Sequence, residues 1–359
     1  MAFNNNNGPA EILSDSSNFA IFVVAPGAFT DKANLPSGVE GYLSYVQNLE
    51  YLALNVGGSN WRTFQTRPMD YKNEVILEQG TVGGGYNGTS VFQAITKIHY
   101  ASDAPLQLLP TLPFASRYGS QHSTYLYGYY HQGGSTNGTV TTSGVACKQD
   151  WATFTVTSIP ARANCIGEGA TSIQPGPKQQ NTIGVINIGT DGCYLNFATD
   201  AWAAGYALPV TSSSGGNSAF GATYGYTNNT GPGWSNVYKL NWATLTWSAT
   251  SSGSGSFGTW GRALNTKFNK WFQGGPTSAI NRYNNSSDTF ASVAPNPSGA
   301  FQEQETLMGQ DWGYWSGYNG NYSTTVFKTD YAAEITSVVQ RGSFNYNHSS
   351  GMGCWGPIP

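Results

Sequence analysis

The sequence predicts an all-β protein built from seven repeated units, and three observations support this fold class. The first is composition: aromatic residues make up 14% of the chain and glycine accounts for 45 of its 359 residues, a mixture that favours strands and turns over helices. The second is a short motif that recurs along the chain. The third is the nearly constant spacing of its copies, which is the mark of a repeat architecture.

The motif reads Leu-Asn, five residues, Trp. It occurs without gaps at Leu54–Trp61, Leu195–Trp202 and Leu240–Trp247. Looser copies lie around Asp150, Asn284 and Asp330, and the weakest lies near Tyr100. We take one residue of each copy as an anchor, which gives Asn55, Tyr100, Asp150, Asn196, Asn241, Asn284 and Asp330. These anchors define seven units of about 45 residues.

Each unit is expected to contain a hairpin of strands at its anchor. An alternating apolar run such as Ser235–Leu240 precedes the anchor, and a second short run follows the aromatic residue. Asn or Asp at the anchor suits a turn because its short side chain can accept a hydrogen bond from the backbone two residues on. Glycine clusters upstream, such as Gly83–Gly85, are expected to end an earlier strand at a tight turn or bulge.

A four-stranded sheet about every 40 to 50 residues is typical of a β-propeller, in which each unit forms one blade. A glycine doublet, an aromatic-bearing strand and a Trp after a turn resemble the Kelch repeat, most closely between Gly261 and Ala294. This resemblance implies a seven-bladed Kelch-like β-propeller over about residues 42 to 359. The WD repeat fits less well because its Gly-His and Trp-Asp signatures are missing.

The two ends of the repeat region each supply part of a unit. Only the run Gly41–Val46 precedes Asn55, and only the strands of about Gly342 to Trp355 follow the last complete unit. We expect these two parts to form one blade together and to close the ring, which would leave no open sheet edge. The predicted domains are an N-terminal arm, residues 1–40, and a propeller, residues 41–359.

Residues 1–40 lie outside the repeat and are expected to form an extended arm without a secretory signal. Its apolar run is too hydrophobic to be left in water, and it is far shorter than the roughly 20 residues that cross a bilayer. We therefore expect the arm to anchor the protein on a partner, without membrane insertion. The predicted anchoring residues are Phe19, Ile21, Phe22, Val23 and Val24.

Two stretches of the repeat region are dense in aromatic residues and glycine, around Tyr125–Tyr130 and Trp312–Tyr318. Flat rings among Asn, Gln and Ser side chains suit stacking on sugars, while alternation along a strand equally suits packing between neighbouring sheets. Both interpretations stay open. The candidate glycan-binding residues are Tyr127, Tyr130, Trp312, Trp315, Tyr318 and Tyr322.

No catalytic constellation is evident. A Gly-x-Ser-x-Gly elbow and a Walker loop are both missing. Glu303 and Glu305 share one face of a predicted strand at a spacing shorter than glycoside hydrolysis usually needs. With Arg117, Arg162 and Arg262 they are expected to line or approach the central channel. We predict no catalytic residues.

The histidines and cysteines do not cluster at metal-ligand spacing. His122 and His131 could meet across adjacent strands, where a lone pair is typically structural. The cysteines are scattered, so we expect unpaired structural thiols. No metal site and no cofactor are predicted.

Charged residues make up only 10% of the chain and the formal net charge is −3, so nucleic acid is not an expected partner. Low charge, abundant Asn, Gly and Thr, and the Met1–Asn5 start resemble virion proteins of tailed bacteriophages. This resemblance implies a structural or adhesive virion component in multiple copies, bound to other virion proteins and to host surface glycans. A carbohydrate-active enzyme or oxidase, and a cytosolic Kelch-like interaction module, are the alternatives, because fold alone does not decide function.

Overall fold

The computed structural model describes strands in the first part of the chain and most of the rest. The described residues are 10–12, 21–23, 42–46, 51–55, 61–64, 79–100, 103, 107–124, 126–136, 139–140, 144–162, 171–173, 183–188, 191–205, 218–220, 223–228, 237–250, 264–265, 270–274, 279–295, 302–309, 311–318, 324–343 and 352–356. Every regular element within these residues is a β-strand, so the all-β prediction is confirmed. They contain no helix of the length and apolarity needed to cross a membrane.

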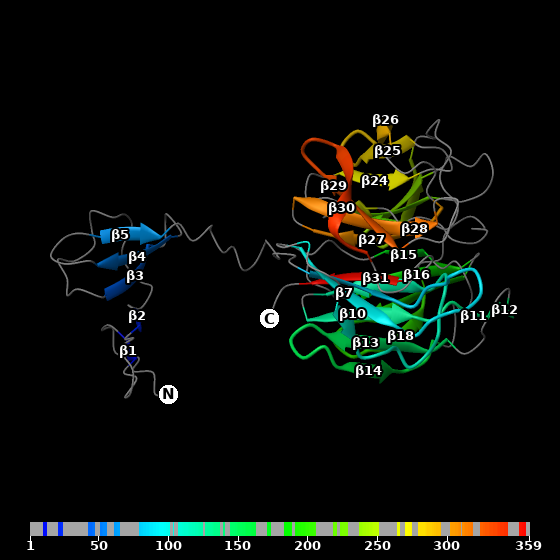
Figure 1. Ribbon diagram of the computed structural model, residues 1–359, viewed down its shortest axis with the longest axis horizontal. Coiled ribbons are helices and arrows are strands. Elements are labelled where there is room, and N and C mark those ends of the chain that lie inside the picture. The colour runs from blue at the N-terminus through cyan, green and yellow to red at the C-terminus, as the bar shows by residue number, and fades with distance from the viewer. Residues whose placement is uncertain are drawn as a thin grey trace. The chain divides into compact units, whose positions relative to one another are not determined.

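The chain forms two compact units, Met1–Glu74 and Val75–Pro359 (Figure 1). The first unit holds one five-stranded sheet in the order β1-β2-β3-β4-β5. Its strands are β1 (Ala10–Ile12), β2 (Ile21–Val23), β3 (Tyr42–Val46), β4 (Tyr51–Asn55) and β5 (Trp61–Phe64). Strand β2 pairs antiparallel with β1 and parallel with β3.

This sheet corrects the predicted extended arm and the predicted boundary near residue 40. Ile21, Phe22 and Val23 form β2, whose backbone pairs with two strands of the same chain. Phe19 and Val24 lie outside the described residues. The strands around Asn55 belong to this first unit, and the boundary between units follows Glu74. Backbone pairing can therefore order this segment without a partner.

The described part of the second unit contains six four-stranded antiparallel sheets, here called sheets 1 to 6. Sheet 1 is β31 (Met352–Gly356), β6 (Gln79–Gly83), β7 (Ile95–His99) and β8 (Gln107–Leu109). Sheet 2 is β9 (Ser120–Ser123), β10 (Tyr127–His131), β13 (Ala146–Asp150) and β14 (Val156–Ile159), and β11 (Gly134–Thr136) with β12 (Thr139–Val140) forms a hairpin after β10. Sheet 3 is β15 (Thr171–Ile173), β16 (Ile183–Ile188), β17 (Asp191–Asn196) and β18 (Ala201–Ala204).

The remaining three sheets are each built from four strands that follow one another in the chain. Sheet 4 is β19 (Ser218–Phe220), β20 (Tyr224–Asn228), β21 (Val237–Asn241) and β22 (Trp247–Ala249). Sheet 5 is β23 (Leu264–Asn265), β24 (Lys270–Gly274), β25 (Ala279–Asn284) and β26 (Thr289–Pro295). Sheet 6 is β27 (Gln302–Met308), β28 (Trp312–Tyr318), β29 (Thr325–Asp330) and β30 (Ile335–Ser343).

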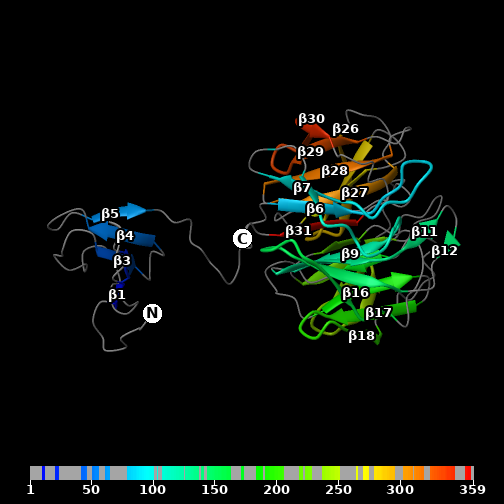
Figure 2. The same cartoon turned by 60° about the horizontal axis from the view of Figure 1, so that its bottom comes forward.

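The first strands of the six sheets contact one another in a closed cycle. Strand β31 contacts β9, β9 contacts β15, β15 contacts β19, β19 contacts β23, β23 contacts β27, and β27 returns to β31. In both views the red strand β31 lies beside the cyan strands of sheet 1 (Figures 1 and 2). The second unit is therefore a β-propeller-like ring, with its own C-terminal strand as the innermost strand of sheet 1.

Within the described residues this cycle has six sheets, where the sequence predicted seven blades. The C-terminal strand pairs with β6, and Cys354 lies opposite Thr81. It does not pair with the run near Gly41–Val46, which forms β3 of the first unit. The motif at Asn55 misled the count because it also forms a hairpin, but in another sheet.

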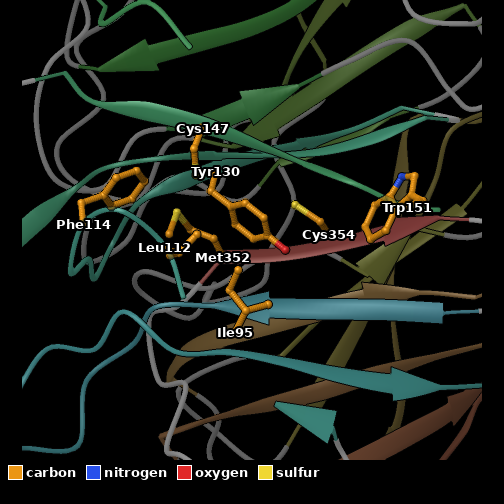
Figure 3. Close-up of a cluster of buried hydrophobic side chains, with 8 residues drawn as sticks. All are labelled: Ile95, Leu112, Phe114, Tyr130, Cys147, Trp151, Met352 and Cys354. Atoms are coloured by element: carbon orange, nitrogen blue, oxygen red, sulfur yellow. The ribbon is translucent and has the colours of Figure 1, made fainter. Parts of the chain in front are cut away.

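A core cluster forms where the ring closes. Met352 and Cys354 of β31 are fully buried against side chains of sheets 1 and 2 (Figure 3). The other members of this cluster are Ile95, Leu112, Phe114, Tyr130, Cys147 and Trp151. Close by, Gly84 and Gly85 follow β6 with φ of 73° and 119°. Residues with a side chain disfavour such positive φ values, so the predicted glycine turn is confirmed.

The anchor turns have the predicted chemistry in sheets 2 to 6. The anchor side chain accepts a hydrogen bond from the backbone N–H two residues later, for example Asp150 Oδ1 from Ala152 at 2.8 Å and Asn241 Oδ1 from Ala243 at 2.8 Å. The equivalent bonds at Asn196, Asn284 and Asp330 span 2.9, 2.9 and 2.8 Å. In sheet 1 the last strand residue is His99, so the anchor position there is one residue before Tyr100.

The recurring Trp residues are equivalent in two of three copies. Trp202 lies opposite Leu195 and Trp247 lies opposite Leu240, and both are half-buried beside neighbouring apolar clusters. Trp61 lies opposite Asn55 instead. The hairpin of the first unit is thus one residue longer between its paired positions, although the sequence motif is the same.

Candidate functional site at the sheet junctions

At five of the six junctions, neighbouring sheets are joined by side chains at two fixed offsets from the anchors. One lies two residues before the anchor of one sheet. The other lies four residues after the anchor of the next sheet, where the backbone φ is between 47° and 58°. We call the contacting residues the junction pairs: Lys97 with Phe154, Lys148 with Asp200, Lys239 with Asp288, Arg282 with Glu334, and Lys328 with Asp103. The same two positions at the junction of sheets 3 and 4 hold Tyr194 and Leu245.

Four junction pairs are ion pairs. Lys148 Nζ lies 2.5 Å from Asp200, Lys328 Nζ lies 3.0 Å from both carboxylate oxygens of Asp103, and Lys239 bonds to Asp288. Arg282 Nη1 donates to both oxygens of Glu334, at 2.7 and 2.8 Å. The pair between Lys328 and Asp103 joins sheet 6 to sheet 1. The scarce charges of the chain therefore hold the ring together across its closing junction as well as within it.

In sheets 2, 4 and 6 the lysine also lies over an aromatic ring of the preceding strand. Its Nζ is 4.4 Å from the ring centroid of Tyr127, 4.8 Å from that of Tyr224 and 4.0 Å from that of Trp312. Each of these lysines is attracted by a ring quadrupole and by a carboxylate at once. The lysine is thereby fixed between two partners and its long side chain has few alternative positions.

Three of the four carboxylates accept a further hydrogen bond from a buried tyrosine. Tyr314 Oη donates to Asp103 at 2.5 Å, Tyr129 Oη donates to Asp200 at 3.2 Å, and Tyr283 Oη donates to Asp288 at 2.9 Å. Burial, together with the nearby carboxylate, raises the pKa of all three phenols well above the usual value. They therefore remain donors at all physiological pH values.

The other two junctions use a cation–π contact and an apolar contact. Lys97 Nζ lies 4.0 Å from the ring centroid of Phe154, and burial lowers the pKa of Lys97. Tyr194 packs on the cluster formed by Val185 and Leu240, which belong to adjacent sheets. Sequence reasoning missed the junction pairs. Aligning the turns on their anchors would have revealed them, because a cation recurs two residues before the anchor and an acid recurs four residues after it.

A buried histidine pair occupies the junction between sheets 2 and 3. His122 Nδ1 lies 2.9 Å from His131 Nε2, across the paired strands β9 and β10. His122 Nε2 lies 3.3 Å from the carbonyl oxygen of Val185 in sheet 3. The expectation that these histidines meet across adjacent strands is confirmed.

The histidine pair is enclosed by aromatic and cationic groups. The His131 ring meets Trp202 edge-on at 5.1 Å and the His122 ring meets Phe197 at 5.7 Å. Arg162, which is buried, donates from Nη2 to the carbonyl oxygen of Gln132 at 2.7 Å and faces Trp202. Burial, then His122 and Arg162, lower the pKa of His131 well below its ordinary value. His131 is therefore neutral near pH 7.

Of the predicted glycan-binding residues, two are core residues. Tyr130 and Trp315 are 0% and 1% exposed, and their polar atoms bond to neighbouring side chains, including Thr81 and Thr329. Their ring faces are not accessible to a sugar, because alternation along these strands serves packing between sheets. Tyr127 and Trp312 are half-buried beneath the junction lysines. The structure describes the backbone of Tyr318 in β28, and Tyr322 lies outside the described residues.

Other candidates are distributed without forming a catalytic arrangement. Cys147, Cys193 and Cys354 are buried and form no disulfide, as predicted, and Cys165 lies outside the described residues. Arg117 lies against the rings of Tyr86 and Tyr118, at 5.0 and 4.8 Å. The structure describes Glu303 and Glu305 as backbone of β27, and Arg262 lies outside the described residues. Among the described residues no three His, Cys, Asp or Glu side chains gather to hold a metal ion.

Comparisons with known proteins support the fold class. No protein-family model and no curated protein matches the chain. Among solved structures 962 chains match. One, described as the structure of YjhT, has 14% sequence identity and a TM-score of 0.54, with 68% of this chain and 89% of that chain covered. At this identity the likeness shows the fold alone, and the second unit belongs to the class of β-propeller-like structures.

Proposed function

We propose that this protein is a structural and adhesive component of a tailed-phage virion, in its tail, fibre, collar or capsid surface. In this proposal residues 1–74 mount the protein on other virion proteins, in multiple copies per particle. The second unit, as a Kelch-like propeller, is presented to the host surface, including its glycans. The single observation that carries the proposal is the division of the chain into a ring that closes on itself and a separate strand-built unit.

The ring needs no partner strand in the part of the chain that the structure describes. Its first strands contact each other in a cycle, and a junction ion pair spans the closing interface between Lys328 and Asp103. The five-stranded sheet of the first unit ends at β1 and β5 in its strand order. Unpaired sheet edges are ready templates for strand addition by another chain. We therefore assign attachment to the first unit.

Removal of residues 2–74 tests the mounting role. We expect the truncated ring to melt within a few degrees of the full chain, because the two units are separate compact bodies. We also expect it to be missing from assembled particles when it replaces the full chain during infection. The measurements are thermal melting of the purified proteins and quantitative immunoblotting of purified particles, with an identically tagged full chain as the control.

Normal copy numbers of the truncated protein in particles would contradict the mounting role. A truncated protein that fails to melt cooperatively would contradict the independence of the ring. The purified ring should also compete with particles for attachment to host cells. Attachment that is unaffected by saturating amounts of the ring would contradict its adhesive role.

A further inference from the structure

The histidine pair at the junction of sheets 2 and 3 has a use beyond packing. Its hydrogen bonds assign the tautomers of both rings. His122 Nε2 faces the carbonyl oxygen of Val185, which can only accept, so this nitrogen carries the proton. His122 Nδ1 must then accept, and His131 Nε2 donates to it. The nitrogen left without a proton is His131 Nδ1, which has no hydrogen-bond partner among the described residues.

A proton added to the pair therefore binds His131 Nδ1, where no neighbouring group that the structure describes stabilises the positive charge. His131 is 0% exposed and His122 is 1% exposed, so water does not solvate the new charge. A proton on His131 Nδ1 would be a buried donor with no acceptor described nearby, next to the guanidinium of Arg162. The neutral pair is satisfied at three nitrogens, whereas the protonated pair carries an uncompensated charge.

The titratable groups around the pair do not offset this charge. From β9 and β10 the two histidines face one another, and Arg162 approaches from the segment after β14. From β31 the thiol of Cys354 donates to the carbonyl oxygens of His122 and Tyr129. Asp200 lies after β17 and is bonded to Lys148 and to the hydroxyl of Tyr129. Trp202 and Phe197, from sheet 3, complete the enclosure.

The pair also sets the approach of the two sheets. A Cβ on Gly184 of β16 would lie 2.6 Å from both Cδ2 and Nε2 of His122, a distance that packed atoms do not tolerate. Sheet 3 therefore contacts the His122 imidazole through the backbone of Gly184 as well as through the ring of Phe197. Any displacement of His122 moves the sheet contact itself.

We propose that the His122–His131 pair is an acid-sensitive joint, at which uptake of a proton separates sheets 2 and 3 and opens the ring locally. The joint is independent of the mounting role of residues 1–74. In an acidic surrounding this junction opens first, while the junctions held by Arg282 with Glu334 and by Tyr194 with its apolar neighbours stay closed. The device couples the acidity of the environment to the closure of the ring.

The direction of the pH effect follows from proton binding. The pKa of His131 is lowered well below 6.5 in the folded ring, whereas in the unfolded chain it returns to about 6.5. Below about pH 6.5 the unfolded state therefore holds more protons, and stability falls as pH falls. Each extra proton raises the unfolding equilibrium constant about tenfold per pH unit. Above about pH 6.5 the His131 side chain is neutral in both the folded and the unfolded state, so the effect of pH on stability vanishes.

The test compares the full chain with His131→Gln and with His99→Gln between pH 7.5 and 4.5. Glutamine keeps an N–H donor near the position of His131 Nε2 but does not titrate. Urea unfolding should show that His131→Gln removes about one proton from the pH dependence below pH 6.5. His99, half-buried in sheet 1, is the matched control because it lies outside the junction of sheets 2 and 3. Equal slopes for the full chain and His131→Gln would overturn the proposal.

Two measurements on the unsubstituted chain locate the opening. Hydrogen exchange, corrected for intrinsic rates, should accelerate at pH 5 in β10 and β16 before it does in β25 and β29. Uniform acceleration around the ring would overturn the joint. Nitrogen chemical shifts of labelled histidine should show His131 Nδ1 still unprotonated in the folded ring at pH 5.5. A His131 ring that titrates near 6.5 with unchanged exchange rates would also overturn it.

Discussion

Deletion of Met352–Pro359 is expected to unfold the second unit. Strand β31 is the innermost strand of sheet 1 and pairs with β6 along its whole length. Met352 and Cys354 are 0% exposed in the cluster of Figure 3. The strand also contacts β9 and β10 of sheet 2 and β27 of sheet 6, so its loss affects two junctions.

The free energy of unfolding lost by this deletion is expected to exceed the total stability of a typical domain. Removal of one large apolar core side chain costs about 2 to 5 kcal/mol, and the deletion also leaves the edge of buried β6 that faced β31 without backbone partners. A domain is stable by only about 5 to 15 kcal/mol. We expect aggregation or the loss of a cooperative melting transition, measured by circular dichroism. Deletion of residues 357–359, which follow β31, is the control and should melt like the full chain. An unchanged melting temperature after the longer deletion would contradict ring closure by β31.

The second large effect concerns the junction pair that joins sheet 6 to sheet 1. Asp103→Asn leaves Lys328 near the ring of Trp312 without its counter-charge, and Lys328→Met leaves Asp103 with only the tyrosine hydroxyl. The side chain of Lys328 is 22% exposed and that of Asp103 is 28% exposed, so solvent screens part of their attraction. We expect each change to cost about 2 kcal/mol and the coupling energy in a double-mutant cycle to be about 1 kcal/mol.

Urea unfolding of the four proteins in the cycle measures this coupling. Repetition in about 1 M salt should reduce it, because a partly exposed ion pair is screened. Asp150→Asn is the matched control, since Asn occupies the same anchor position in sheets 3, 4 and 5. It should change the free energy of unfolding by less than about 0.5 kcal/mol. A coupling energy indistinguishable from zero at low salt would contradict the role of this pair in closing the ring.

Local chemistry was predictable from the sequence. The Asn and Asp anchors were recognised because an Asx turn is made by residues that are neighbours in the chain. The meeting of His122 and His131 was foreseen for a similar reason, since a short hairpin brings them opposite each other. Repetition of such turns was enough to indicate an all-β propeller-like ring.

The blade count depended on contacts between distant segments. Asn55 has the Leu-Asn-to-Trp spacing of the repeat, but Ala53 and Ser59 stand at the offsets that hold junction pairs elsewhere. Ala53 and Ser59 cannot form the ion pairs that join neighbouring sheets of the ring at these offsets. The interpretation of Tyr130 and Trp315 as sugar-binding failed for a related reason. An aromatic residue on a strand looks the same in sequence whether its ring faces solvent or the next sheet.

Closure of the ring between β31 and β6 is the central claim, and a single disulfide tests it. Thr81 and Cys354 are directly opposite each other in these strands, and opposite residues of antiparallel strands have a Cα separation that a disulfide accepts. Thr81→Cys and, separately, Ser44→Cys of β3 are oxidised in the full chain beside the unsubstituted protein, and mass spectrometry identifies the linked peptides. Closure by β31 predicts an intramolecular bond from position 81 to Cys354 and none from position 44. A bond from position 44 to Cys354, with none from position 81, would contradict it.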